Sequence, residues 1–351
     1  MSDALNLLDD HRPAQREAAL QLLAILERSA RTDPTMNLAA ALEHTGRFPR
    51  SEPKASGELH KDARSEPKAS GEVHRDAPRV GLTGAPGVGK STLLDALVRA
   101  LRARGETIGI IAVDPSSRVS GGALLGDRAR VRAGASDRGV FLRSMAARER
   151  LGGLADATWP SIAVLAAVFD RVFVETVGVG QSEAEVADLV DTLVFVAQPG
   201  AGDVLQFMKA GILEHPDVFA VNKADLGAAA ERTASELQSA LAMAARDASG
   251  WQRPVLLLSA RDGSGVAALV AAIDAHRAHL VACGALAARR QRARIAFVLD
   301  ALERRYGAFG IERLGGRDAL HARLLAEPEG AGAEFGLGLA REIEAALGKP
   351  S

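Results

Sequence analysis

The sequence predicts an α/β fold of the P-loop NTPase class: a mostly parallel sheet flanked by helices, with helical extensions at the N- and C-terminal ends. Three observations support this class. Short apolar runs alternate with helix-length segments from residue 79 onward. A glycine-rich loop ending in Lys90 and Ser91 follows the first of these runs. A polar residue ends one run after another, and the carboxyl ends of parallel strands share one edge of a sheet.

The apolar runs have the length and continuity of strands that are buried on both faces. We expect six of them, at residues 80–83, 108–113, 171–175, 193–197, 218–221 and 255–258. Crossover helices are expected between them, the first at residues 91–104. The residues that end these runs include Asp114, Glu175, Gln198, Asn222 and Ser259. Their shared position predicts a single site.

The bulk composition is that of a protein with a substantial core, since 47% of the 351 residues are hydrophobic and 25% are charged. The formal net charge of −1 provides no field that would favour nucleic acid or an anionic membrane. A single cysteine, Cys283, excludes an internal disulfide and a cysteine-based metal cluster. The first residues lack a basic n-region, and the apolar run at 18–26 is too short to span a bilayer. These features predict a cytoplasmic protein.

The loop GAPGVGKS matches the phosphate-binding pattern G-x-x-x-x-G-K-[ST] in full. Its glycines allow backbone N–H groups to converge on phosphate oxygens, and the following helix adds its positive N-terminal end. Lys90 would supply charge to the outer phosphates and act in catalysis, and Ser91 would offer a hydroxyl to Mg²⁺. The predicted phosphate-binding residues are Gly84, Ala85, Pro86, Gly87, Val88, Gly89, Lys90, Ser91 and Thr92.

A second motif selects the base. Asn222, Lys223 and Asp225 form an N-K-x-D sequence after a predicted strand. An aspartate carboxylate can accept two hydrogen bonds from guanine, whereas adenine presents no such pair of donors, and an unpaired buried polar group discriminates strongly. Ser259 and Ala260, after the last strand, fit a second guanine loop. Together the motifs predict that GTP is bound in preference to ATP.

Carboxylates and glycines near the predicted strand ends are candidates for catalysis and for binding Mg²⁺. Glu175 can hold a Mg²⁺-bound water, and a Gly178 backbone N–H can bond the γ-phosphate and lose that bond on hydrolysis, which makes a switch. Gln181 is a candidate for orienting the attacking water. Asp114 and Asp127 are further candidates for Mg²⁺ or water, each with the alternative role of a helix cap or turn residue.

The segments on either side of this domain are different in kind. Residues 50–63 are repeated almost verbatim as residues 64–77, which we interpret as a tandem duplication in a polar linker rather than a two-copy docking motif. We therefore divide the chain into an N-terminal helical segment (1–48), the linker (49–78), a GTPase domain (79–280) and a C-terminal helical arm (281–351).

The predicted arm has two features of its own. An apolar stripe from Ile295 to Tyr306 requires a partner surface, and we expect this arm to mediate dimerisation. A cluster of four arginines precedes the stripe, at positions 289, 290, 292 and 294. We expect these arginines to form the solvated face of a helix rather than a contact with nucleic acid.

With these residues in view, the chain resembles the MeaB/ArgK family of G proteins, the chaperones of adenosylcobalamin-dependent acyl-CoA mutases. The resemblance covers about residues 80–226. It rests on the strings GLTGAPGVGKSTL, IIAVDPSSRVSGGALLGDRARV, VFVETVGVGQSEAEVADLVD, PGAGDVLQFMKAGI and VNKAD. The strings ETVGVGQSE and VDPSS…GG…LGD are far more specific than the phosphate loop alone.

The resemblance implies a GTPase, converting GTP and water to GDP and phosphate, that docks on a B12-dependent mutase. There it would gate delivery of adenosylcobalamin and removal of damaged cofactor, and adenosylcobalamin would be met only through the mutase. The first and second switches would map to residues 114–127 and 175–183. A third switch, coupling nucleotide state to the partner, would map to residues 200–209 and be carried by Asp203, Gln206 and Lys209. A homodimer, and an adenosyltransferase of the same pathway as a further partner, are also implied.

The sequence departs from the family pattern in places that bear on the partner. Glu149 stands where a glycine is usual, and Val204 and Phe207-Met208 replace the usual residues of the third switch. The client is therefore open between methylmalonyl-CoA, isobutyryl-CoA and 2-hydroxyisobutyryl-CoA mutases. Alternative functions are a metal-insertion GTPase of another metalloenzyme, a transport-associated P-loop NTPase, and a small-molecule kinase. We expect slow intrinsic turnover, because the sequence assigns no arginine finger.

Overall fold

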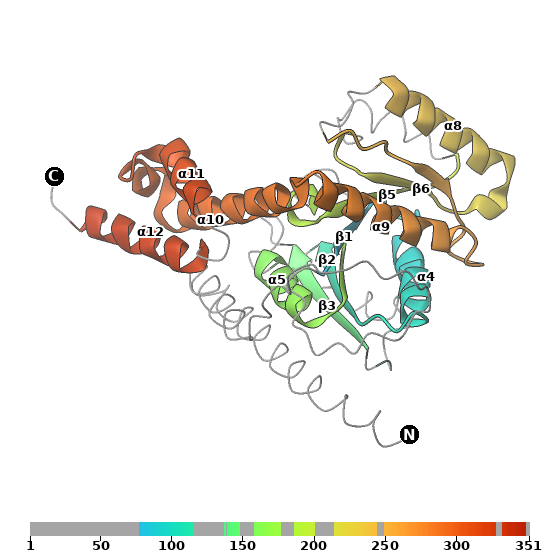
Figure 1. Ribbon diagram of the computed structural model, residues 1–351, viewed down its shortest axis with the longest axis horizontal. Helices are drawn as coiled ribbons and strands as arrows, with labels where there is room; N and C mark the ends of the chain where they lie inside the picture. The colour runs from blue at the N-terminus through green and yellow to red at the C-terminus, as the bar shows by residue number, and fades with distance from the viewer. Residues whose placement is uncertain are drawn as a thin grey trace, which may run out of the picture.

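The computed structural model describes residues 77–115, 137, 139–147, 158–176, 186–200, 214–243, 249–327 and 332–348. Within them, seven strands form one sheet in the order β3-β2-β4-β1-β5-β6-β7 (Figure 1). The strands are β1 (Arg79–Thr83), β2 (Ile108–Pro115), β3 (Val140–Ala147), β4 (Arg171–Glu175), β5 (Thr192–Ala197), β6 (Val218–Val221) and β7 (Val255–Leu257). All six neighbouring pairs are parallel, which confirms the predicted fold class.

The helices of the described residues connect these strands or follow the last of them. They are α4 (Lys90–Arg102), α5 (Thr158–Val168), α8 (Ala228–Met243), α9 (Val266–Ala282), α10 (Ala285–Glu312), α11 (Gly316–Ala326) and α12 (Gly332–Leu347), with a short 3₁₀ turn, η4 (Ala224–Leu226). None of them is by itself long and apolar enough to cross a membrane, and α9 with α10 passes that test only as a pair bent by 92°.

Strand β3 is the element that the sequence analysis missed. It pairs with β2 over eight residues at the edge of the sheet, and it carries Arg143 and Ser144 among apolar residues. An edge strand is only partly covered, so Phe141 through Ser144 are half-buried and polar residues are tolerated there. The prediction relied on continuous apolar runs, which mark strands that are covered on both faces.

The two faces of the sheet are covered by different helices, following the two-residue alternation of strands. Val194, Val196 and Val218 belong to a core cluster with α4 and α9. On the opposite face, Phe195 and Phe219 pack with the apolar side of α8, and α5 covers β2 and β4. Residues that alternate along β5 thus enter different cores, which is why the apolar run is continuous.

The C-terminal helices form a third core. The apolar stripe of α10 packs within the same chain, against α11, α12 and Trp159 of α5. The indole of Trp159 stacks on the ring of Phe297 at 4.9 Å between centroids. The partner surface that Ile295, Val298 and Leu302 required is therefore supplied by the chain itself, and this stripe gives no argument for a dimer. Figure 1 shows α10 extending from the sheet to α11 and α12.

The arginine cluster is not the solvated face that we expected. Arg289 makes a two-pronged contact with Asp217, at 3.0 and 3.1 Å, and Arg290 makes one with Asp191, at 2.7 and 2.8 Å. Both aspartates are buried and directly precede β5 or β6. These two arginines dock α10 on the amino edge of the sheet, a role that sequence alone does not reveal because the partners are about 70 and 100 residues away.

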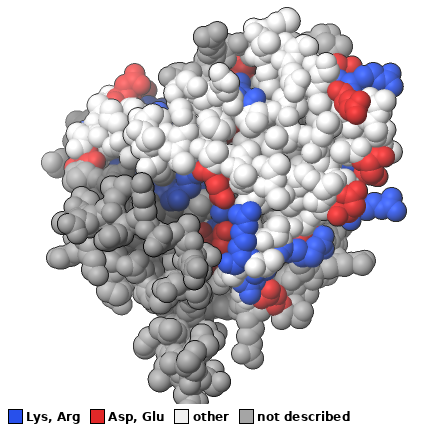
Figure 2. Space-filling view, turned by 45° about the vertical axis from the view of Figure 1, so that its right-hand side comes forward, with Lys and Arg blue, Asp and Glu red and all other residues white. Residues whose placement is uncertain are grey.

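The remaining sequence predictions on the flanking segments lie outside the described residues, including the N-terminal helices, the duplicated linker up to residue 76, and Glu149. The four-part division of the chain stays a prediction. On the face drawn in Figure 2, charged side chains of both signs are interspersed among the described residues, in keeping with the formal net charge of −1.

Candidate functional site

The predicted nucleotide-binding residues of the described chain gather at the carboxyl edge of the sheet. The phosphate loop follows β1, Glu175 ends β4, and the residues of the two guanine loops follow β6 and β7. Since β1 lies in the middle of the sheet with β4 and β5 on either side, loops from both halves meet there. This is the position at which open parallel sheets bind ligands.

Two glycines of the phosphate loop are required by close packing as well as by backbone geometry. Gly84 has φ of 139°, and a Cβ there would collide with the carbonyl oxygen of Val196 in β5. Gly89 has φ of 94°, and a Cβ would lie 2.6 Å from Nδ2 of Asn222. A side chain at either position would be strained and would push the loop away from β5 or β6. The loop is thereby held close to the guanine motif.

Lys90 begins α4 and is buried, with 7% of its surface exposed. Its Nζ donates to the carbonyl oxygen of Gly84 at 2.6 Å and to that of Ala85 at 3.1 Å. The charge thus lies across the first residues of the loop. An ammonium held by neutral carbonyls retains most of its charge for an anion, so this position suits the outer phosphates of a nucleotide.

Ser91 and Glu175 come together from α4 and β4. The Ser91 hydroxyl donates to Oε1 of Glu175 at 2.7 Å, although the two residues are 84 positions apart. A hydroxyl and a carboxylate beside a phosphate loop are hard oxygen ligands, which Mg²⁺ prefers. The residues present therefore fit a Mg²⁺ ion, with Ser91 able to bind it and Glu175 able to hold one of its waters.

Asn222 joins the two halves of the site. Its Nδ2 donates to the carbonyl oxygen of Val88 in the phosphate loop at 2.9 Å, and its Oδ1 accepts from the backbone N–H of Ala260 at 3.0 Å. Asn222 is itself buried. Its amide is thus used to fix the phosphate loop to the second guanine loop, so that both are placed before any base is bound.

The two guanine loops differ in exposure. Asp225 lies in η4 and is exposed, whereas Ser259 and Ala260 are buried. The turn after Ser259 is closed by hydrogen bonds from Gly263 N to Ser259 O and from Ser264 N to Asp262 Oδ1. Hydrogen bonds from Ser264 hold the pKa of Asp262 below its ordinary value. The Asp225 carboxylate is accessible to a base, beside a rigid second loop.

The other predicted site residues are not placed here. Asp114 ends β2 at the same edge, but only its backbone is described. Asp127, Gly178, Gln181, Asp203, Gln206 and Lys209 lie outside the described residues. Their proposed roles in catalysis, Mg²⁺ binding and switching stay predictions.

Two contributions were missed by the sequence analysis. Gln198, after β5, accepts a hydrogen bond from Nζ of Lys223 at 2.6 Å. Thr176, after β4, is buried and ties the strand end to β1 through its backbone N–H, which donates to Leu82 O at 3.1 Å. Gln198 was among the polar residues that end apolar runs, so its position carried a signal. Its partner could not be known without the order of the strands.

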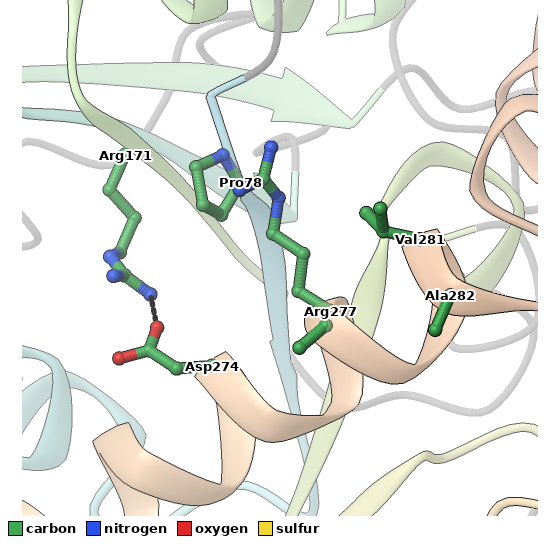
Figure 3. A pocket seen from close by; sticks show the side chains of 7 residues that line it. Pro78, Arg171, Asp274, Arg277, Val281 and Ala282 are labelled. Carbon is green, nitrogen blue, oxygen red and sulfur yellow. Dashed lines mark hydrogen bonds and ion pairs between the residues drawn. The ribbon is translucent and has the colours of Figure 1, made fainter. Parts of the chain in front are cut away.

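A pocket of about 460 Å³ lies away from this site, beside α9 at the amino edge of the sheet (Figure 3). Pro78, Arg171 and Asp274 line it, together with apolar residues of α9. Arg171 donates to Glu106 and to Asp274, at 3.0 and 2.9 Å, so two carboxylates already engage its guanidinium. Among the described residues there is also no group of three or more His, Cys, Asp or Glu side chains placed to hold a metal ion.

Comparisons with known proteins agree with this geometry. A family model described as methylmalonyl Co-A mutase-associated GTPase MeaB matches residues 64–306. A putative GTPase of Pyrococcus abyssi is 46% identical over 216 residues, spanning 61% of this chain and 66% of that protein. The methylmalonic aciduria type A homolog, mitochondrial, of Mus musculus is 39% identical over 216 residues, spanning 61% of this chain and 52% of that protein.

A solved structure is also similar along most of its length. The crystal structure of an LAO/AO transport system kinase is 26% identical, covers 92% of this chain and 97% of that chain, and has a TM-score of 0.51. The similarity to the Pyrococcus abyssi and Mus musculus proteins, in contrast, spans about two thirds and about half of their lengths.

Proposed function

This chain belongs to the MeaB family of methylmalonyl-CoA mutase-associated GTPases, and from that premise we propose that it hydrolyses GTP and reports its nucleotide state to an adenosylcobalamin-dependent acyl-CoA mutase. The observation that carries the nucleotide half of this proposal is the Asn222 side chain, which bonds the phosphate loop on one side and the second guanine loop on the other. One residue thereby places the groups for phosphate and base in a single site.

Binding of the triphosphate would use groups that are already in position. The Lys90 ammonium would move its hydrogen bonds from Gly84 and Ala85 to the outer phosphates, a short displacement within the loop. Backbone N–H groups of residues 87–91, at the end of the loop and the start of α4, would hold the remaining phosphate oxygens. Because these groups are fixed before binding, little reorganisation is needed when charge develops during hydrolysis.

Mg²⁺ would be held by Ser91, with Glu175 accepting from one of its waters, and bound there it would neutralise charge on the β- and γ-phosphates. The Ser91 hydroxyl would release Glu175 to do so. Asp114 and Asp127 are proposed as further carboxylates for the ion or its waters. Gly178 is proposed to bond the γ-phosphate through its backbone N–H, and Gln181 to orient the attacking water.

The partner half of the proposal rests on the family and on the sequence strings that define it. We propose that a cytoplasmic homodimer of this chain docks on the mutase and gates delivery of adenosylcobalamin and removal of damaged cofactor. An adenosyltransferase would be the second partner. Residues 200–209 would couple the two proteins through Asp203, Gln206 and Lys209.

The decisive experiment measures GTP and ATP turnover of the purified chain, alone and with saturating methylmalonyl-CoA, isobutyryl-CoA or 2-hydroxyisobutyryl-CoA mutase. We expect slow turnover of GTP alone, acceleration by one of the three mutases, and little turnover of ATP. Equal use of ATP would favour a transport-associated NTPase. GTP turnover that no mutase accelerates would contradict the chaperone role and favour GTP-driven metal insertion into another enzyme.

Lys209→Ala tests the proposed coupling directly. GTP affinity and intrinsic turnover should change little, because the residue lies outside the loops for phosphate and base. Stimulation by the mutase should fall by roughly 5- to 150-fold, the range of a coupling free energy of about 1–3 kcal/mol. Turnover of both forms with and without saturating mutase is the measurement, and equal stimulation would remove the switch role while leaving the GTPase assignment intact.

A further inference from the structure

The side chain of Lys223 bridges three loops of the candidate site. Lys223 itself belongs to the first guanine loop, and its Nζ donates to the carbonyl oxygen of Gly87 in the phosphate loop at 3.1 Å. The same ammonium donates at 2.6 Å to Oε1 of Gln198, which follows β5. The four-carbon stem therefore crosses from the residues that select the base to those that bind phosphate. A nucleotide whose base contacts the guanine loop and whose phosphates contact the phosphate loop would therefore place its nucleoside along this stem.

Lys223 is also held in an unfavourable backbone conformation. Its φ of 60° makes it the single residue other than glycine with positive φ among those the structure describes. Such a conformation is unfavourable for a residue with a side chain, and it persists only where the surroundings over-determine it. Here Asn222 N donates to Ala197 O, and Ala224 N to Leu258 O, so backbone hydrogen bonds fix both neighbours of the strained residue. The strain aims the side chain at Gly87 and Gln198.

Among the described residues, the hydrogen bond from Lys223 is the contact that accounts for the position of the Gln198 side chain. It is half-buried at the end of β5, and its carbonyl oxygen receives the shorter of the two hydrogen bonds that Lys223 donates to Gln198 and Gly87. Without this acceptor, the ammonium would retain one neutral carbonyl of a glycine loop, and a lysine side chain has enough rotamer freedom to leave it for water. A hydrogen bond to a charged group is stronger than one between neutral groups, so the bond to Gln198 favours the position of the ammonium against Gly87.

We propose that Gln198 is a positioning residue of the guanine site: it holds the Lys223 ammonium against Gly87, and so keeps the lysine stem as a fixed wall along which the nucleoside binds. This inference deepens the proposed function and rests on it. It also assigns Gln198 a role independent of the γ-phosphate. GDP and GTP should therefore depend on Gln198 equally, while the chemical step, which uses Lys90, Ser91 and Glu175, should not.

The test compares Gln198→Met, which keeps the length of the side chain and removes the acceptor, with Gln238→Met, an exposed glutamine of α8 in the same domain. Titration calorimetry with GDP gives the affinity, and GTP turnover gives KM and kcat. For Gln198→Met we expect a Kd for GDP about tenfold higher and a KM for GTP raised to a similar extent, with kcat within about twofold of wild type. Gln238→Met should match wild type in all three.

The double variant separates positioning from general damage. If Gln198 acts through Lys223, then Lys223→Met and the pair Gln198→Met with Lys223→Met should bind GDP with the same Kd within about twofold. The inference would be overturned if the two substitutions raised the Kd for GDP multiplicatively in the double variant. It would also be overturned if Gln198→Met bound GDP like wild type. A drop in kcat equal to the rise in KM would also overturn it, because a role in the chemical step would then be shown. Failure of the wild type to bind GDP would instead count against the proposed function.

Discussion

The two edges of the sheet use the same strands for opposite purposes. At the carboxyl edge, glycines with positive φ and loop carbonyls surround Lys90, and the exposed Asp225 and half-buried Glu175 lie at the same edge. At the amino edge, aspartates before β5 and β6 are buried and fully engaged by arginines of α10. A charge paired with an opposite charge inside the chain stabilises the fold, whereas a charge held by neutral groups, as Lys90 is by two carbonyls, can be offered to a ligand.

Asp217 is the centre of a polar network at the amino edge. Asp217 accepts from Leu193 N at 2.7 Å as well as from Arg289, and its carboxylate lies 3.4 Å from Nε2 of His276. The other ring nitrogen of His276 is 2.9 Å from the hydroxyl of Thr192, and Trp251 Nε1 donates to the carbonyl oxygen of Asp217. Elements of the GTPase domain and of the predicted arm are therefore joined by buried polar contacts, which are costly to break one partner at a time.

Asp191 shows how strongly this edge depends on its partners. Burial alone would raise the pKa of Asp191, but hydrogen bonds and charge from Arg290 and Arg79 outweigh it and lower the pKa below 3.8. The folded state thus favours the ionised form. This contribution to stability is present above the unfolded-state pKa and is lost as the pH falls through the lower folded-state pKa.

The comparison predicts that the largest functional loss comes from the carboxyl edge. Lys90→Ala should reduce kcat for GTP by about 10²–10³-fold or more and weaken nucleotide binding, because the outer phosphates lose their buried cation. Unfolding free energy should change less, since Lys90 donates to the neutral carbonyls of Gly84 and Ala85 and its removal from these contacts leaves no unpaired charge there. Turnover assays with a parallel thermal melt measure both, and wild-type turnover in this variant would refute the site.

The amino edge should show the reverse pattern. Arg290→Ala leaves Asp191, which is 1% exposed, without its principal charge partner and should lower the unfolding free energy by about 3–5 kcal/mol. Arg317→Ala is the matched control: Arg317 pairs with Asp300 at the surface, the two being 49% and 51% exposed, so about 0–1 kcal/mol is expected. Urea unfolding at neutral pH distinguishes them. Similar losses in both would contradict the difference between buried and exposed pairs.

Repeating the urea unfolding at lower pH tests whether the unpaired Asp191 charge causes the loss of stability. In Arg290→Ala the desolvation of Asp191 is no longer offset by Arg290, so its pKa should rise, and the penalty should lessen as falling pH protonates the carboxyl. The gap between wild type and variant should therefore narrow from pH 7 toward pH 4. A gap that is constant over this range would show that lost packing, and not an unpaired charge, causes the instability.

Base selection should give a smaller effect confined to the carboxyl edge. Asp225→Asn should weaken guanine nucleotides by about 2–4 kcal/mol, through the loss of a charge-assisted pair and an unpaired buried contact in the complex. Xanthine nucleotides should bind better than to wild type, because their C2 carbonyl can accept from the new amide. Calorimetry with GDP and XDP measures both affinities, and the expected rise for XDP serves as the control that the variant is folded. Unchanged affinity for GDP would refute the guanine-loop assignment.

The smallest effect is expected from the duplicated linker. Deleting residues 64–77 joins Ala63 to Pro78. Because both repeats end in alanine, the Ala63 carbonyl would take the place of the Ala77 carbonyl that Arg290 contacts. GTP turnover should be unchanged and the melting temperature should shift by less than about 2 °C, since a polar insertion adds mainly loop-closure entropy. A loss of many degrees would show that the repeat packs on the domain.

Sequence reasoning succeeded where the signal was local. The phosphate loop, the N-K-x-D motif and the six predicted strands are each specified by residues within about ten positions of one another. Continuous apolar runs identified six strands, including the partly covered edge strand β7, but they could not identify β3, whose apolar residues are interrupted by Arg143 and Ser144. The residues of the guanine loops were predicted, but the bond between Lys223 and Gln198 was not.

The sequence by itself thus determined the fold class, and it predicted the chemistry of the carboxyl edge and a preference for guanine, because glycine geometry and motif spacing act over short stretches of chain. Tertiary structure alone decided that Arg289 and Arg290 are buried anchors and that the stripe of α10 packs on its own chain. An exposed arginine and an anchoring arginine have the same pattern in sequence. What separates them is a buried carboxylate brought from 72 or 99 residues away by the folding of the sheet.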